Sequence, residues 1–407
     1  MIKRIFVVFA FIITVIITNA QQSANDFYDA GVVQFELGNY AAAIPLFTSC
    51  IELSKYYYEA FLDRGRCYYL TGKKDQALAD YNSSLEIKDD YYKTYYHRAI
   101  YYKDAGNTGK AFSDINKVIE LKPNKADAYI LRAAWFHEAG DLDNALADYN
   151  RILELKEDDP DALINRGRIY QGKEMMEEAF NDFSAVIENN PEIAEANYYR
   201  GQLLEAVERY PVAIEDYTAA IEKGYAEEDV FIRRYTLAMK LEMWDIAIND
   251  LNNLIANFQE RSSELWNKRG ICYAAKGEHS EAIINFNRAI SLDRNNEEAY
   301  INRADSKVAL GKEASALSDY NRIININPKN GYAYEGRAIY WFNKERFDMA
   351  EPDFEKAIKY APTGRAYFYR GAMRDMQGDN KGACEDLQKA VDLEYPGAKE
   401  AMDRVCR

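Results

Sequence analysis

The sequence has little of what catalysis usually requires. It contains only three histidines, and no HExxH, Walker-type loop, nucleophile elbow or dinucleotide fingerprint occurs in it. The five cysteines form no CxxC pair, so neither a zinc site nor a thioredoxin-like redox site is indicated. We therefore expect a protein that is not an enzyme, with no catalytic residue, no metal site and no cofactor.

Proline and excess positive charge are also scarce. Nine prolines in 407 residues leave room for much helix, because proline interrupts helix interiors. Lysine and arginine number 51 against 66 aspartates and glutamates, giving a formal net charge of −15. This balance argues against nucleic acid and against anionic lipid surfaces, which both need a basic footprint. Acidity that keeps a long surface soluble is the simplest interpretation, and a basic partner is the alternative.

No long hydrophobic run follows the first twenty residues. Within them, Lys3 and Arg4 precede an apolar stretch, residues 5–17, and small residues end at Ala20 before Gln21. This three-part pattern predicts a secretory signal peptide over residues 1–20, and the apolar stretch is short for a membrane span. We expect an exported protein, periplasmic or extracellular, without a membrane span after cleavage. An uncleaved anchor is the alternative.

What the sequence does contain is a repeat. An arginine recurs at intervals of 33 to 35 residues: Arg64, Arg98, Arg132, Arg166, Arg200, Arg234, Arg269, Arg303, Arg337 and Arg370. Sixteen residues after each stands an acidic residue, or once an asparagine: Asp80, Asp114, Asp148, Asp182, Asp216, Asp250, Asn285, Asp319, Asp353 and Asp386. Ten matched positions indicate a repeat protein, whose repeats bury their apolar faces by stacking.

The residue pattern of each repeat predicts two helices joined by a tight turn. In residues 92–121, apolar side chains recur at helical spacing on both sides of Gly106, which allows the left-handed conformation common at helix C-termini. Pro123 then helps to end the second helix. A glycine or alanine usually follows the arginine, and an alanine precedes the acidic position by three residues. These small residues allow the two helices to approach closely.

The period, the small residues in both helices and an aromatic residue four positions after the second alanine, as at Tyr81, resemble the tetratricopeptide repeat. The leader and the C-terminal sequence are also similar to those of exported repeat proteins of Bacteroidetes. The resemblance implies an all-α fold: a right-handed superhelical solenoid of about eleven helix-turn-helix repeats over residues 21–396, then a C-terminal capping helix, 397–407. The repeats start near residues 24, 58, 92, 126, 160, 194, 228, 263, 297, 331 and 364. The seventh has Tyr235 at a small-residue position and an extra residue near 257–262, so any kink between two halves is expected there.

The arginine ladder has two interpretations, an anion-binding track and a set of structural ion pairs. The constant offset places each arginine opposite an acidic residue on a facing antiparallel helix, which favours structural pairs. The pairs in repeats two to six are Arg64–Asp80, Arg98–Asp114, Arg132–Asp148, Arg166–Asp182 and Arg200–Asp216. The first repeat lacks both members, which favours pairing within a repeat. Arg269 would meet the neutral Asn285.

The cysteines allow one plausible bridge. Cys384 lies on the second helix of the last repeat and Cys406 at the end of the capping helix, which should pack antiparallel, so we predict a disulfide between them. A bridge between Cys50 and Cys67, on helices of adjacent repeats, is the less favoured alternative. Cys272 is expected to be a buried small hydrophobe.

In the tetratricopeptide family, positions 2, 5, 9, 12 and 13 of the first helices line a concave groove. Carried onto this chain, the resemblance implies a partner-binding groove that includes Tyr28, Phe35, Arg66, Tyr69, Tyr96, Lys103, His137, Arg168, Tyr198, Phe342 and Phe368. Rigid aromatic rings with a polar end suit protein recognition. The alternative for any one residue is packing between neighbouring first helices. Position 5 is mostly tyrosine, isoleucine or leucine in the first seven repeats, which argues against the lysine–asparagine clamp for chaperone C-termini.

These observations predict a protein–protein interaction scaffold or adaptor in the cell envelope, which binds segments of partner proteins in its groove. A carbohydrate or cell-wall binder that stacks exposed tyrosines on sugar rings is the alternative, and self-association is a third hypothesis. The spread of aromatic residues over many repeats favours a protein partner, because a sugar site would be a compact aromatic cluster.

Overall fold

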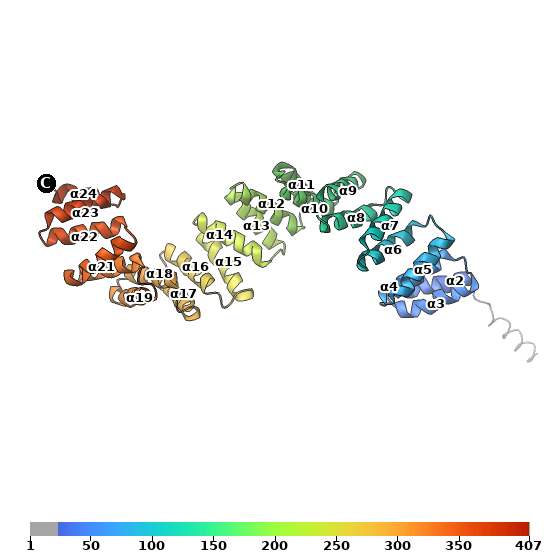
Figure 1. Ribbon diagram of the computed structural model, residues 1–407, viewed down its shortest axis with the longest axis horizontal. Helices are drawn as coiled ribbons and strands as arrows, with labels where there is room; N and C mark the ends of the chain where they lie inside the picture. The colour runs from blue at the N-terminus through green and yellow to red at the C-terminus, as the bar shows by residue number, and fades with distance from the viewer. Residues whose placement is uncertain (1–22, 407) are drawn as a thin grey trace, which may run out of the picture. The chain divides into compact units, whose positions relative to one another are not determined.

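The computed structural model describes residues 23–406; the expected signal peptide lies outside them. In this part of the chain there are 23 helices and no strand, which confirms the all-α repeat fold (Figure 1). The helices of the first five repeats are α2 (Ala24–Glu36), α3 (Tyr40–Leu53), α4 (Tyr58–Leu70), α5 (Lys74–Ile87), α6 (Tyr92–Asp104), α7 (Thr108–Leu121), α8 (Ala126–Glu138), α9 (Leu142–Leu155), α10 (Pro160–Gly172) and α11 (Met176–Asn189).

The remaining six repeats and the last helix follow in the same alternation. They are α12 (Ala194–Ala206), α13 (Tyr210–Glu222), α14 (Glu228–Lys240), α15 (Trp244–Asn257), α16 (Ser263–Ala275), α17 (His279–Leu292), α18 (Glu297–Ala309), α19 (Glu313–Ile326), α20 (Gly331–Asn343), α21 (Phe347–Tyr360), α22 (Gly364–Met376), α23 (Asn380–Asp392) and α24 (Ala398–Val405). Even-numbered helices up to α22 are the first helices of their repeats. Each packs most extensively on the second helix of its own repeat, and α24 covers α23.

The chain divides into two compact units, one ending at Asn190 and one beginning at Pro191. They are called the N-terminal unit and the C-terminal unit. No helix among residues 23–406 has both the length and the hydrophobicity that a membrane crossing needs.

The boundary between the two units does not fall at the seventh repeat, where a kink between two halves is expected; that repeat lies inside a large buried cluster of the C-terminal unit. Tyr235 is only 7% exposed in this cluster. The facing second-helix position, which holds tyrosine or phenylalanine in most repeats, holds Leu251 here. The large and the small side chain have therefore changed places between the two helices, and the pair still fills its space.

Close contact between a glycine and an aromatic ring joins the two helices in many repeats. A Cβ atom added at Gly270 would lie 2.4 Å from the ring of Phe286, which is fully buried. At Gly167 the corresponding distance to Phe183 is 2.7 Å. A larger residue at either position would require the ring or the helix to shift, because its Cβ would lie closer to the ring than van der Waals contact allows.

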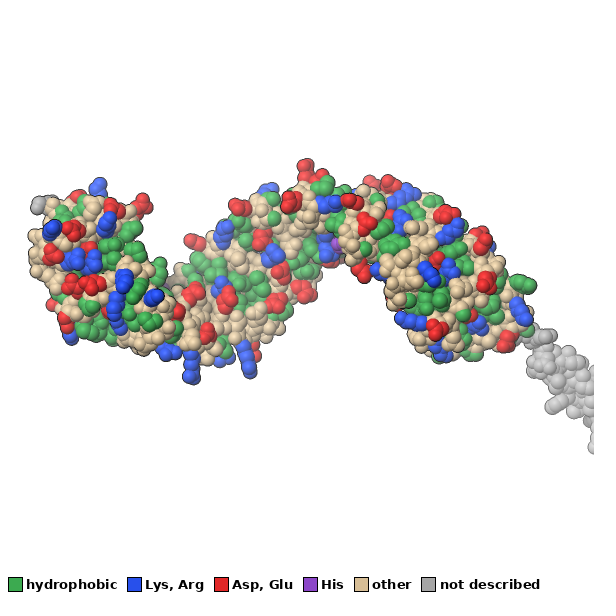
Figure 2. Space-filling model, in the orientation of Figure 1, with side chains coloured by type: hydrophobic (Ala, Val, Ile, Leu, Met, Phe, Trp, Pro, Cys, Tyr) green, Lys and Arg blue, Asp and Glu red, His purple; other side chains and the backbone are tan. Residues whose placement is uncertain are grey.

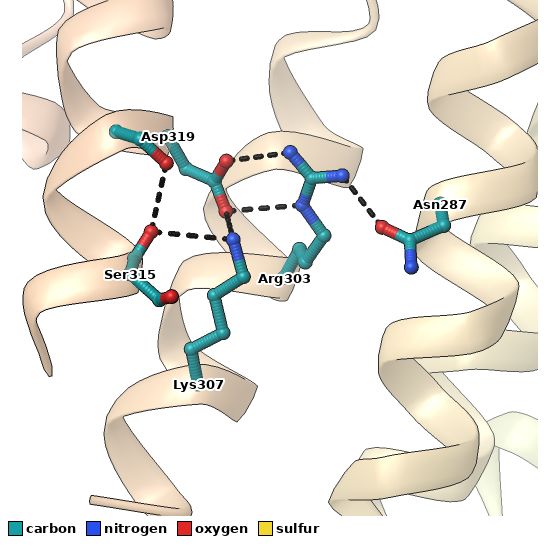
Figure 3. A network of polar contacts seen from close by, with 6 residues as sticks. Asn287, Arg303, Lys307, Ser315 and Asp319 are labelled. Carbon is teal, nitrogen blue, oxygen red and sulfur yellow. Dashed lines mark hydrogen bonds and ion pairs between the residues drawn. The ribbon is translucent and has the colours of Figure 1, made fainter. Parts of the chain in front are cut away.

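Nine of the ten ladder arginines bind the acidic residue of their own repeat. Arg303 shows the arrangement in Figure 3: its Nε and Nη2 donate to the two carboxylate oxygens of Asp319 at 3.0 and 2.5 Å. Lys307 Nζ donates to the same carboxylate at 2.8 Å. The same two-pronged contact joins Arg64–Asp80, Arg98–Asp114, Arg132–Asp148, Arg166–Asp182, Arg200–Asp216, Arg234–Asp250, Arg337–Asp353 and Arg370–Asp386.

A third member of this ladder escaped the sequence analysis. The remaining Nη1 of Arg303 donates to Asn287 Oδ1 at 2.6 Å, on the second helix of the preceding repeat (Figure 3). Equivalent acceptors for other arginines are Thr48, Asn82, Asn116, Asn150, Thr218, Asn252 and Asn321. Each of these eight arginines thus ties three helices together. The signal was the short polar residue two positions after the acidic one.

Arg269 is the ladder arginine without an acidic partner, as the asparagine at position 285 predicts. Its Nε donates to Asn285 Oδ1 at 2.6 Å, and its guanidinium lies 4.3 Å from the centre of the Trp266 ring. Burial without an opposing carboxylate lowers the pKa of Arg269.

The last helix is held by a disulfide between Cys384 on α23 and Cys406 after α24, with 5.6 Å between their Cα atoms. Cys50, Cys67 and Cys272 are free and buried, so the alternative bridge between Cys50 and Cys67 is absent. Burial raises the pKa of the Cys67 thiol to about 12 and those of Cys50 and Cys272 to about 11.

We expect the folded, unreduced protein to resist thiol labelling, because the three free thiols are buried and protonated. Denaturation without reductant should expose those three and leave Cys384 and Cys406 unreactive. Reduction should lower the local stability of α24 by about 2–4 kcal/mol. Mass spectrometry after alkylation and amide hydrogen exchange of α24 measure both effects. Rapid labelling of Cys272 in the native state would contradict the expectation.

Candidate functional site: the first-helix face

We use the term first-helix face for the side of each unit formed by its first helices. In the N-terminal unit, several predicted groove residues on this face bind one another across neighbouring repeats. Tyr28 on α2 donates to Asp63 Oδ2 on α4 at 2.8 Å, and Arg66 Nη1 donates to Asp63 Oδ1 at 2.8 Å. The Arg66 guanidinium lies 4.2 Å from the centre of the Phe35 ring. These side chains fix the spacing of α2 and α4.

The next first helices are joined in the same way. The Tyr69 hydroxyl on α4 donates to the Asp104 carboxylate at the end of α6. Lys103 on α6 pairs with Glu138 on α8 at 2.8 Å, and its ammonium lies 5.9 Å from the Trp135 ring. The predicted groove residues Tyr28, Phe35, Arg66, Tyr69 and Lys103 therefore pack between neighbouring first helices, although each keeps some exposed surface.

A hollow of about 260 Å³ opens between α4, α6 and α8. Its lining is basic and aromatic: Arg66, Tyr92, Lys93, Tyr96, His97, Lys125 and Asp127. Lys125 pairs with Asp127 at 2.5 Å, whereas Lys93 has no ion pair within residues 23–406. Burial, and then the charges of Arg66 and Lys93, lower the pKa of His97 to about 3, so this imidazole is neutral at physiological pH.

Protonation of His97 should destabilise the folded chain. Its pKa is near 6.5 when unfolded and about 3 when folded, so between these values the unfolded state binds more protons and stability falls as the pH falls. Replacing His97 by Gln should reduce the loss of stability between pH 7 and pH 4.5. Urea unfolding of both proteins at the two pH values measures how much unfolding free energy each one loses. Because both proteins contain the same carboxylates, the contributions of these groups cancel when the two losses are compared. Equal losses in the two proteins would refute this assignment.

A second hollow, of about 560 Å³, lies between α8 and α10. Its floor is apolar and its rim is acidic: Ile130, Ala134, His137, Glu138, Tyr149, Ile152, Asp159, Asp161, Ala162 and Asn165 line it. Ile130 is 39% exposed and offers apolar surface to this hollow. Asp159 caps α10 by accepting from the Ala162 backbone N–H at 3.1 Å.

The C-terminal unit corrects one predicted groove residue. Tyr198 is only 7% exposed, stacks on Tyr225 at 4.5 Å between ring centres and donates to Asp229 at 2.5 Å, so it packs inside the unit and is not available to a partner. Phe342 and Phe368 are half-buried against Tyr369, with ring centres 5.6 Å away in both cases. Arg168, in the N-terminal unit, is exposed on α10.

The two hollows also contain residues that the sequence analysis did not name. Among them are Lys93, Lys125, Asp127, Ala134, Asp161 and Asn165. Several stand at positions that the family rule already includes: Lys93, Asp127 and Asp161 are all at position 2 of their first helices. The rule could therefore have found them, but it could not show which ones lack an ion pair.

The visible surface shows acidic and basic side chains interspersed over both units (Figure 2). No group of three or more histidine, cysteine or acidic side chains within residues 23–406 is arranged to hold a metal ion.

Comparison with known proteins identifies the family. Tetratricopeptide repeat profiles match residues 34–99, 96–162, 164–227, 263–296, 297–330 and 342–399, together well over half of the chain. The chain belongs to the tetratricopeptide repeat family. Comparison with curated proteins finds no match.

Solved structures of the same family are similar. A tetratricopeptide repeat protein from Parabacteroides merdae is 22% identical, covers 61% of this chain and 99% of its own, and has a TM-score of 0.43. The C-terminal part of a repeat protein from Cytophaga hutchinsonii is 18% identical, covers 57% and 95%, and has a TM-score of 0.44. YrrB, described as a repeat protein with an unusual peptide-binding site, is 23% identical, covers 46% and 95%, and has a TM-score of 0.40.

Proposed function

We propose that this protein is a non-catalytic scaffold of the cell envelope that binds extended segments of other proteins on its first-helix face. The observation that carries the proposal is the pair of hollows on the N-terminal unit, both lined by first-helix side chains. Their mixture of exposed aliphatic, aromatic and charged groups suits a polypeptide, which offers all three kinds of contact. Membership of a family whose repeats form peptide-binding surfaces supports the same conclusion.

Export is part of the proposal. The leader pattern of residues 1–20 supports it, and so does the disulfide between Cys384 and Cys406, because structural disulfides persist mainly in oxidising compartments. Fractionation of expressing cells, with N-terminal sequencing of the recovered protein, tests it. Recovery of the uncleaved chain from the cytoplasm would overturn this part.

Blocking one hollow tests the binding function. Ala134 on α8 is exposed and lines the larger hollow. Ala147 is also exposed and lies on α9, the other helix of the same repeat. Residues 21–407 would be panned against displayed random dodecapeptides, and the selected peptides measured by fluorescence anisotropy. Ala134→Trp should weaken their binding at least about tenfold by filling the recess, whereas Ala147→Trp should leave it unchanged.

Peptides that bind all three proteins equally would place recognition elsewhere. Failure to select any peptide, together with binding on a glycan array, would replace the proposal by the carbohydrate alternative.

A further inference from the structure

We propose that the N-terminal unit selects a segment that carries one acidic and one basic side chain, with the acidic one at Lys93 and the basic one at Asp161. This inference rests on the proposed function and specifies the chemistry of the partner. The argument depends on which charges of the two hollows are already neutralised inside the protein.

In the smaller hollow, two of the three cations have partners. Arg66 binds Asp63 at 2.8 Å and Lys125 binds Asp127 at 2.5 Å. Lys93 is exposed and forms no ion pair with any residue from 23 to 406. An incoming carboxylate would therefore meet an unpaired ammonium beside the neutral imidazole of His97, whose N–H can donate a hydrogen bond.

In the larger hollow, the charge that remains unpaired is negative. Glu138 is paired with Lys103 at 2.8 Å, and Asp159 caps α10 and lies 3.6 Å from Lys156. The Asp161 carboxylate is exposed and forms no ion pair or hydrogen bond in the described chain. Asp161 stands in the first turn of α10, where the positive end of the helix dipole stabilises its charge.

The floor of the larger hollow fits the stem of a long basic side chain. Ile130 and Ala134 present exposed aliphatic surface next to the acidic rim. Lysine and arginine pack their methylene groups on such surface while the charged end reaches polar groups. A short acidic side chain would meet repulsion from Asp161 and gain nothing from this floor.

The spacing of the two positions follows from the repeat. Helix α8 borders both hollows, through Asp127 on one and Ile130 on the other, so the hollows are neighbours. Packed helices lie about 8–10 Å apart, and an extended chain advances about 3.3 Å per residue. Lys93 on α6 and Asp161 on α10 are two such spacings apart, with α8 between them, so the segment needs its acidic and basic residues about five or six positions apart.

The test reverses both charges at once. The double variant Lys93→Glu with Asp161→Lys keeps the net charge. It should lower the affinity for peptides selected on the unaltered chain at least about tenfold, because two ion pairs with the peptide are lost. It should also bind peptides in which the acidic and basic residues have been exchanged. Lys93→Gln and Asp161→Asn, as milder single variants, should each weaken binding about fivefold without a new repulsion.

A matched control lies on the second helices of the same unit. Lys74→Glu with Glu177→Lys exchanges exposed charges in the first turns of α5 and α11, so it also keeps the net charge and alters two helix N-termini in the same way. This control should bind the original peptides normally. Circular dichroism would verify that all variants are folded.

Selection of peptides without paired acidic and basic residues, or equal binding by the reversed variant, would overturn the inference while leaving the proposed function intact. Absence of any bound peptide would instead overturn the proposed function itself.

Discussion

Replacing Asp250 by Ala should destabilise the C-terminal unit by about 3–5 kcal/mol, because it would strand a buried positive charge. Arg234 is 6% exposed and Asp250 fully buried, the most enclosed pair of the ladder. Two short contacts of 2.9 and 2.6 Å join them, and Thr218 alone would remain to accept from the guanidinium at 2.8 Å. Urea unfolding followed by tryptophan fluorescence measures the loss.

The eighth repeat provides the control. Asn285 already gives Arg269 a neutral partner, so Asn285→Ala removes a hydrogen bond but no opposing charge and should cost only about 1–2 kcal/mol. Equal losses in the two variants would show that hydrogen bonding, rather than charge compensation, stabilises the ladder.

Replacing Phe286 by Ala should cost about 3–5 kcal/mol through the cavity that it leaves. The ring is fully buried and fills the space above Gly270, where an added Cβ would lie 2.4 Å away. Gly270→Ala alone should cost about 1–3 kcal/mol by overpacking. The double variant should cost less than the sum, because the alanine methyl enters the space vacated by the ring.

Ile284 serves as the control for this prediction. It lies on the same helix, α17, but is 56% exposed, so Ile284→Ala should change stability by less than about 0.5 kcal/mol. Strict additivity of Gly270→Ala and Phe286→Ala would contradict the direct contact between them.

The sequence predicted the fold well because each packing requirement recurs. The helix pairs begin at the residues from which the repeats were counted, since the arginine marks the same contact in ten repeats and the small residue and the acidic residue each do so in nine of them. Where a repeat departs from the pattern, the sequence did not show how the two helices still pack. Tyr235 stands where a small residue is usual, and Leu251 on the facing helix compensates for its size.

The groove residues were harder to predict because equivalent positions have different neighbours. Tyr96 and Tyr198 both occupy position 5, yet Tyr96 lines a hollow, whereas Tyr198 is covered by Tyr225 and bound to Asp229. These neighbours come from the turn after α13 and from the next first helix, so the pattern within one repeat does not reveal them.

The sequence by itself determined the helices, their pairing and the arginine–acid ladder, because these depend on spacing within a single repeat. The tertiary structure alone decided which charges of the first-helix face are neutralised. Lys93 and Asp161 remain unpaired while Asp127, at the same position of the intervening repeat, is bound by Lys125. Such differences arise because ion pairs form only over a few ångströms, and those distances are set by how neighbouring repeats pack.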